Sequence, residues 1–235
     1  MLDGQVIHFG VPPLVGDFVA LNTPAQMIPS HGTDLLGQRF AYDLVYVTPR
    51  ENNKPSNRDL YIKNSLVKHF LIGVSADSFR SWSQEVVSPL SGRVVSVQDG
   101  QNDRLRVWAL WEILPSLFVR IPPGEDLRSI IGNSLILETT SGFLFFAHFK
   151  RGSIRVKAGE LVTTGQVVGL IGNSGNSTMP HLHIHLMDRE DLQTAAGVPL
   201  GFLDLLAVDD LGNWEKMNEV VLKPFQRYRN SPRDD

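Results

Sequence analysis

The sequence predicts a mainly β protein built from antiparallel strands, and three observations support this prediction. Apolar residues occupy every second position over 182–186, which is the period of a strand whose two faces differ. The same period runs through residues 39–47. Two further β-prone runs, 133–138 and 143–149, flank turn residues at 140–142 and form a predicted hairpin. We therefore expect an antiparallel β-sheet or β-sandwich, with a few short helices in insertions.

The composition limits the chemistry. The chain has 235 residues, of which 42% are hydrophobic, as in globular proteins. A formal net charge of -3 makes nucleic acid an unexpected partner. There is no cysteine, so any zinc would be held by histidines and carboxylates. No stretch of about 20 apolar residues could span a bilayer, and the N-terminus lacks the basic start and apolar run of a signal peptide.

We expect three parts along the chain. They are N-terminal strands packed on the core (1–26), a main domain (27–190) and a C-terminal extension (191–235). In the extension, 220–224 has the pattern of a strand, and the charged end, 227–235, is expected to be disordered. Within the main domain, 101–130 is interpreted as an insertion. Its Trp108 and Trp111 either pack on the core or form a lid or partner surface.

Three histidines mark the candidate site. His181, His183 and His185 alternate with the apolar residues, so they share the opposite face of the predicted strand. A turn-forming run, 173–177, precedes them, and Pro180 fixes the entry of the strand. A single histidine is usually structural, but three on one face favour a metal site. Because one strand cannot complete a tetrahedral zinc site, the other ligands must come from elsewhere in the chain.

Residues 172–185, GNSGNSTMPHLHIH, resemble the signature of the lysostaphin-type (LytM-type) zinc endopeptidases. The resemblance covers roughly residues 27–190, so the main domain is interpreted as a peptidase domain of this type. It implies a duplicated hybrid-motif fold, and residues 86–98 and 154–171 resemble the two halves of that fold in their pattern of short strands.

The resemblance also implies roles for single residues. His148, in a Phe-Ala-His-Phe sequence that is similar to the family's Tyr-Ala-His-Leu element, and His181 would be catalytic. His183 and Asp43 would bind zinc. The family's His-x-x-x-Asp pattern would require a histidine at position 39, where this chain has Arg39. Arginine stays protonated and cannot replace that ligand.

Either the first zinc ligand comes from another position or the site is degenerate and catalytically inactive. The nearest histidine is His31, and a divergent subgroup of the family has such a distant Ser-His before a Gln-Arg-Phe-Ala-x-Asp strand. The resemblance to that subgroup implies that His31 is the ligand, with Asp34 as a weaker alternative. His185 and Arg39 are placed beside the ligands or at the rim of the site, and His185 could equally be a solvated residue.

The implied function is zinc-dependent hydrolysis of peptide bonds in the stem or cross-link peptides of peptidoglycan, with Zn²⁺ as cofactor. The alternative is an inactive relative that serves as a peptidoglycan- or protein-binding regulatory module. A biotinyl-type carrier domain is disfavoured, since no lysine lies in a Met-flanked hairpin. The resemblance implies a periplasmic, cell-wall or extracellular location, while a cytoplasmic location and a protein activator both remain open. The chain has no His-Glu-x-x-His, phosphate-loop or G-x-S-x-G motif.

Overall fold

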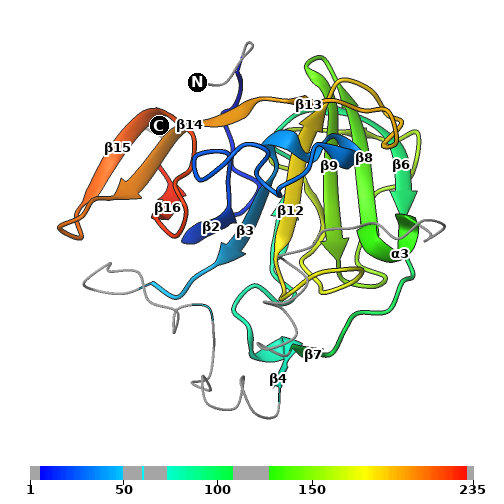
Figure 1. Cartoon of the computed structure of the whole chain (residues 1–235), viewed down its shortest axis with the longest axis horizontal. Helices are drawn as coiled ribbons and strands as arrows, with labels where there is room; N and C mark the ends of the chain where they lie inside the picture. Colours follow the sequence, from blue (N-terminus) through cyan, green and yellow to red (C-terminus); the bar gives the residue numbers. More distant parts are fainter. Residues whose placement is uncertain (1–5, 50–59, 61–72, 108–126, 232–235) are drawn as a thin grey trace.

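A computed structural model describes residues 6–49, 60, 73–107 and 127–231 of the chain. The fold is mainly β, as predicted, and is organised around one large sheet (Figure 1). Most of the expected insertion, including Trp108 and Trp111, lies outside the described residues. Within the described ranges, no helix is long and apolar enough to cross a membrane.

The secondary-structure elements are short. The strands are β1 (Ile7–Phe9), β2 (Phe18–Asn22), β3 (Tyr42–Tyr46), β4 (Val74–Ser75), β5 (Glu85–Val87), β6 (Gly92–Gln98), β7 (Arg106–Val107), β8 (Asn133–Thr139), β9 (Gly142–Phe149), β10 (Leu161–Val162), β11 (Val167–Leu170), β12 (Leu182–Met187), β13 (Gly197–Val198), β14 (Leu200–Val208), β15 (Trp214–Val220) and β16 (Arg227–Asn230). The helices are the 3-10 segments η1 (Leu35–Phe40) and η3 (Ala76–Ser78) and the α-helix α3 (Leu127–Ile131).

The large sheet has the strand order β1-β14-β16-β2-β3-β12-β9-β8-β6-β10, with β13 beside β12 and β15 beside β14. Its described pairs are antiparallel except β1 with β14, which is parallel. The predicted hairpin is confirmed as β8 and β9, which pair from Asn133 with Phe149 to Thr139 with Gly142. Strand β12 lies in the middle of the sheet between β3 and β9 (Figure 1).

The two pattern-related segments, 86–98 and 154–171, each contain two short strands, as expected. The first segment supplies β5 and β6, and the second supplies β10 and β11. The strands pair between the segments and not within them, since β6 pairs with β10 and β5 pairs with β11, both antiparallel. The pair β5–β11 forms a separate small sheet. Val86 and Val168 of this small sheet are fully buried in the main hydrophobic core.

The strand predicted over 39–47 is shorter than expected. Residues 42–46 form β3, but Arg39 and Phe40 belong to η1. The reason is local. The backbone at Leu36 and Gly37 has positive φ angles of 60° and 70°, which kink η1, and the strand begins only after this segment. The predicted alternation along β3 is confirmed. Tyr42, Leu44 and Tyr46 join the main core, whereas Val45 packs with Val19 and Val47 on the other face.

The expectation for the C-terminal extension was wrong in two places. Residues 220–224 do not form a strand of their own, since β15 ends at Val220. The charged end is ordered as far as it is described, because residues 227–230 form β16 between β14 and β2. Arg227 is buried beside the Asp17 carboxylate, and the Tyr228 ring stacks on the Phe18 ring. Burial of charged residues needs a partner of opposite charge, and Asp17 lies too far away in sequence for local patterns to reveal it.

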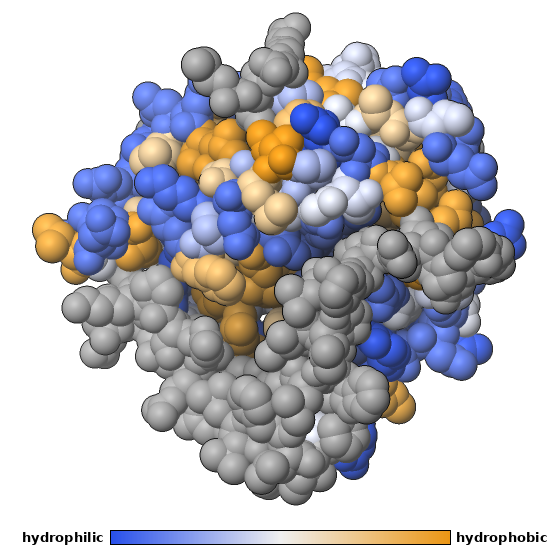
Figure 2. All heavy atoms as spheres, in the orientation of Figure 1, coloured by the Kyte–Doolittle hydropathy of each residue, from blue (hydrophilic) through white to orange (hydrophobic). Residues whose placement is uncertain are grey.

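The apolar face of β12 packs into the main core. Leu182, Ile184 and Leu186 are buried there with residues of the adjacent strands, among them Leu44 and Phe146. On the surface, hydrophobic groups are interspersed among hydrophilic ones on the face seen in Figure 2. The central sheet therefore has one face fixed by the core, and its other face near β12 is available for polar residues.

Candidate metal centre and active site

Strand β12 brings the candidate site together because both of its neighbours carry candidate residues at the same level. On one side, His183 is paired in register with Asp43 of β3. On the other side, His183 is paired with Ala147 of β9, so His148 is the next residue along that strand. His181 directly precedes β12. Residues that are more than a hundred positions apart in the sequence thus become cross-strand neighbours.

A pocket of about 340 Å³ lies over these residues. Its polar lining includes six of the predicted residues: His31, Asp43, His148, His181, His183 and His185. Part of the remaining lining is apolar: Met27, Leu36, Ile130, Ile131, Phe145 and Ala147. A concave site with a few convergent polar groups on an apolar background is typical of ligand and active sites.

Three of the lining residues form a group that could hold a metal ion. The candidate ligand atoms of His31, Asp43 and His183 all lie within 4.8 Å of one another. His31 Nε2 is 2.9 Å from Asp43 Oδ2, and His183 Nδ1 is 3.0 Å from Asp43 Oδ1. Two imidazole nitrogens and a carboxylate oxygen are a donor set that zinc takes, and three protein ligands leave a position for water or substrate.

The hydrogen bonds of His183 leave a lone pair aimed at the carboxylate. Its Nε2 is 3.0 Å from His185 Nδ1, and His185 Nε2 is 3.1 Å from the Leu36 carbonyl oxygen. A carbonyl only accepts, so His185 carries its proton on Nε2 and accepts at Nδ1. His183 must then donate from Nε2, which leaves Nδ1 unprotonated in the neutral ring, facing Asp43.

His31 shows the same arrangement from the other side of Asp43. Its Nδ1 is 3.1 Å from Ser30 Oγ, and Ser30 Oγ donates to the Gln38 carbonyl oxygen at 3.3 Å. The hydroxyl proton is therefore used, so His31 donates from Nδ1 and keeps a lone pair on Nε2. Lone pairs of two rings then face one carboxylate, an arrangement that a cation bound between them would stabilise. The residues therefore fit a metal cation.

His148 and His181 have their Nδ1 atoms tied to backbone carbonyls. His181 Nδ1 lies 2.7 Å from the Met179 carbonyl oxygen, and His148 Nδ1 lies 2.9 Å from that of Ser174. Both rings therefore donate from Nδ1 and keep Nε2 as an acceptor. His181 Nε2 is 3.3 Å from Asp43 Oδ1, and the His148 and His181 ring centroids are 4.8 Å apart. Two potential proton acceptors thus lie beside the candidate metal ligands.

His148 is held in a strained backbone conformation. Its φ is 66°, although it lies in strand β9. Such a left-handed conformation costs a non-glycine residue on the order of 1 kcal/mol or more. The adjacent ladder between β8 and β9 is irregular, with a register shift between Asn133 and Leu135. Strain of this kind is concentrated at functional sites, and here it belongs to a residue of the pocket.

The electrostatics keep the carboxylate charged and most of the rings neutral. Burial by itself raises the pKa of Asp43, but the neighbouring His31 and His181 rings hold that pKa well below its usual range. Burial lowers the pKa of His148 far below its usual value, and nearby His181 and His183 add to this effect. Burial also acts to lower the pKa of His181, but the Asp43 carboxylate overcomes it and raises that pKa.

The structure places two of the predicted residues elsewhere. Arg39 lies outside the pocket lining and pairs with Asp34 through Nη1–carboxylate distances of 2.7 and 2.9 Å. The Asp34 side chain is 61% exposed and lies outside the pocket lining, so this alternative ligand is not part of the candidate metal group. His185 lies in the pocket lining and is only 2% exposed, so it is not a solvated residue.

Sequence reasoning missed Asn22. Its Nδ2 lies 2.6 Å from Asp43 Oδ2, and it lines the pocket. Asn22 ends the apolar strand β2 and reaches Asp43 through an irregular register with β3 between Ala20 and Asn22. The only local signal was one polar residue at the end of an apolar run, which many strands have.

The fold and the pocket together define a mainly β protein with a histidine- and aspartate-lined site suited to a metal ion. Residues 120–195 match the sequence model of Peptidase family M23. This segment therefore resembles the LytM- and lysostaphin-type members of that family. The matched segment contains His148, His181, His183 and His185, while His31 and Asp43 lie outside it.

Individual relatives are similar over only part of their length. The chain is 33% identical over 72 residues to the glycyl-glycine endopeptidase ALE-1 of Staphylococcus capitis, a match that spans 31% of this chain and 20% of that relative. A zinc-containing peptidase from Vibrio cholerae is 26% identical, over 50% of this chain and 28% of its own, with a TM-score of 0.32. Lysostaphin from Staphylococcus simulans is 22% identical, over 65% of this chain and 50% of its own, with a TM-score of 0.33.

Proposed function

We propose that this chain is a zinc-dependent metalloendopeptidase that hydrolyses peptide bonds in the stem or cross-link peptides of peptidoglycan. The observation that carries the proposal is the group of His31, Asp43 and His183, whose ligand atoms lie within 4.8 Å of one another beside two further histidines. The match of residues 120–195 to a peptidase family supports the reaction type. The substrate class is supported by the relative named as a glycyl-glycine endopeptidase. A peptidoglycan substrate implies that the chain acts at the cell wall.

In this proposal His31, Asp43 and His183 hold the zinc ion, which supplies Lewis acidity at the scissile carbonyl when bound. His181 and His148 transfer the proton of the attacking water. Because both rings donate Nδ1–H to backbone carbonyls, their Nε2 atoms accept a proton from the attacking water and return it to the leaving amine. Protonated imidazole at the same place also stabilises developing negative charge on the substrate oxygen.

The first test is the zinc content of the purified protein, measured by elemental analysis. We expect about one zinc per chain in the wild type, since the ligand group forms a single site. His31→Ala removes one of the three ligands and should abolish stoichiometric binding. Asp34→Ala is the matched control, because Asp34 is in the same loop but is paired with Arg39 outside the pocket.

Each outcome decides a separate part of the proposal. Zinc retained in His31→Ala and lost in Asp34→Ala would move the first ligand to the exposed acid. Wild-type protein that stays free of zinc after incubation with the metal would overturn the enzyme proposal. It would leave a peptidoglycan-binding module, which should bind purified peptidoglycan without releasing soluble fragments.

A further inference from the structure

We propose that the 3-10 segment η1 fixes the tautomers of both histidine ligands through two of its own carbonyl groups. The carbonyls are those of Leu36 and Gln38, and they act through His185 and Ser30 as positioning residues. This inference rests on the proposed function for the identity of the metal, but the hydrogen-bond chains exist in the protein itself. They are therefore testable in its metal-free form.

The chain through His185 determines which nitrogen of His183 is free. His185 Nε2 lies 3.1 Å from the Leu36 carbonyl oxygen, and His185 Nδ1 lies 3.0 Å from His183 Nε2. Reversing the tautomer of His185 would turn its Nε2 lone pair against the carbonyl oxygen, and reversing that of His183 alone would turn two ring lone pairs against each other. His185 and His183 are 2% and 7% exposed, so water has little access to replace a lost bond. The free nitrogen of His183 is thus Nδ1, which faces Asp43.

The chain through Ser30 does the same for His31. The Ser30 hydroxyl donates to the Gln38 carbonyl at 3.3 Å and accepts from His31 Nδ1 at 3.1 Å. Ser30 is buried, and its backbone N–H donates to the Arg39 carbonyl at 3.0 Å. The free nitrogen of His31 is thus Nε2. The unprotonated nitrogen is therefore Nε2 in one ring and Nδ1 in the other, and both of these atoms lie beside the carboxylate of Asp43.

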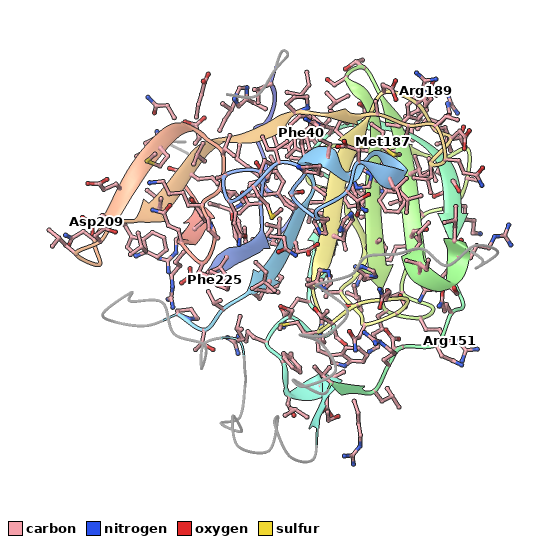
Figure 3. All side chains as sticks on the ribbon, in the orientation of Figure 1. Phe40, Arg151, Met187, Arg189, Asp209 and Phe225 are labelled. Atoms are coloured by element: carbon pink, nitrogen blue, oxygen red, sulfur yellow. The ribbon has the colours of Figure 1, made fainter. Side chains whose placement is uncertain are left out.

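Segment η1 is rigid enough for this role because it is clamped against the end of β12 and against β13. Gly37 has no room for a side chain, since an added Cβ would lie 2.8 Å from Met187 Cγ and 3.3 Å from Ala195 Cβ. A Cβ added at Gly197 of β13 would likewise lie too close to the Gly37 carbonyl oxygen, at 2.6 Å. Figure 3 labels Phe40 of η1 and Met187 of β12 at the same end of the sheet. The positive φ angles at Leu36 and Gly37 turn this clamped backbone so that both carbonyls meet the site.

The function of this arrangement is to prepare the ligand nitrogens before the metal arrives. Hydrogen-bond partners behind metal-ligating histidines typically contribute 10–100-fold to metal affinity, because they fix the tautomer and the ring orientation. Here both imidazoles depend on one short backbone segment. A displacement of η1 should therefore weaken both ligands together, although η1 contributes no ligand atom of its own.

The direct test is ¹⁵N NMR of the histidine rings in the metal-free full-length protein, at a pH where the rings are neutral. Long-range ¹H–¹⁵N couplings report which ring nitrogen carries the proton. We expect the proton on Nε2 in His183 and His185 and on Nδ1 in His31. Protonation of His183 on Nδ1 would overturn the inference, whether or not the protein later binds zinc.

The second test is zinc affinity, measured by competition with a chelator. His185→Phe keeps a ring that can pack on Phe145, which lies 4.8 Å away between centroids, but it removes the acceptor. We expect about 10–100-fold weaker zinc binding. His185→Gln is the rescue control, because its carbonyl accepts from His183 and its amide donates to Leu36, so affinity should return toward the wild-type value. Ser30→Ala and Ser30→Thr form the corresponding pair for His31.

The outcomes separate this inference from the proposed function. Wild-type protein that binds no zinc but shows the expected tautomers would contradict the proposed function alone. Zinc binding that is equal in the wild type, His185→Phe and Ser30→Ala would contradict the inference alone. Equal losses in His185→Phe and His185→Gln would also contradict it, because a role in packing alone, without the two hydrogen bonds, predicts no rescue by glutamine.

Discussion

The two faces of β12 are almost equally buried, but they are stabilised in different ways. Ile184 on the apolar face is 0% exposed, and His183 on the opposite face is 7% exposed. Ile184 packs among apolar side chains of the main core, where removal from water provides the stabilisation. His183 is surrounded by specific partners, Asp43 and His185, at 3.0 Å each. Burial alone therefore does not distinguish core from site, whereas the way in which buried polar atoms are satisfied does.

The largest effect is expected on the histidine side, from His181→Ala. His181 has its Nδ1 bound to a backbone carbonyl and its Nε2 beside Asp43, so it is positioned to move a proton. Loss of such a general acid–base group costs about 10²–10⁴-fold in rate. We expect this loss in the release of new amino groups from purified peptidoglycan, with zinc content unchanged.

His8→Ala is the control for that experiment, because His8 lies on β1 and lines no part of the pocket. It should retain wild-type activity. Loss of zinc together with activity in His181→Ala would make His181 a ligand and would break the division between ligands and proton-transfer groups. Wild-type activity in His181→Ala would remove it from the mechanism.

A smaller effect of a different kind is expected on the apolar face, from Ile184→Ala. The substitution leaves a cavity in the main core and should lower the free energy of unfolding by about 2–5 kcal/mol. Urea denaturation of the metal-free protein measures this change. The zinc content of the folded fraction should stay at the wild-type level, because the side chain points away from the ligands. A loss of less than about 1 kcal/mol would show that this face is not well packed.

Local sequence patterns were sufficient for the strand that organises the site. The alternation of histidines with Leu182, Ile184 and Leu186 predicted β12, its two faces and its contact with the core. Asp43 lies in the β-prone run 39–47 and was assigned as a ligand through the family resemblance, and the structure pairs it with His183. These features depend on a period of two residues, which is a property of the strand itself.

Features that depend on distant pairing could not be predicted in this way. Asn22 reaches Asp43 only because β2 pairs with β3 through an irregular register. The buried Arg227 depends on Asp17, at the other end of the chain, so its sequence resembled a disordered tail. The role of η1 depends on backbone carbonyls, which every residue has, and on a kink at Leu36. Such information lies in the tertiary arrangement and not in residue type.

The smallest expected effect is a difference in pH dependence between the two faces, measured in the metal-free protein. Burial lowers the pKa of His183 and lowers those of His148 and His185 well below the usual value, so these rings stay neutral in the folded state. In the unfolded chain they take up protons below about pH 6.5. The unfolded state then binds more protons, and folding stability must fall as pH falls. The raised pKa of His181 acts in the opposite direction and offsets part of this loss.

We therefore expect the free energy of unfolding to decrease below about pH 6.5, by about 1.4 kcal/mol per pH unit for each net proton taken up on unfolding. Urea denaturation between pH 7.5 and 5 in the presence of a chelator measures this slope. His185→Phe removes one of the neutral buried rings and should make the slope shallower. Ile184→Ala removes no titrating group, so it should lower stability by the same amount at every pH. If the curves of unfolding free energy against pH for both variants run parallel to the wild-type curve, the distinction between the two faces is contradicted. Titration of the histidine face would then contribute nothing to stability.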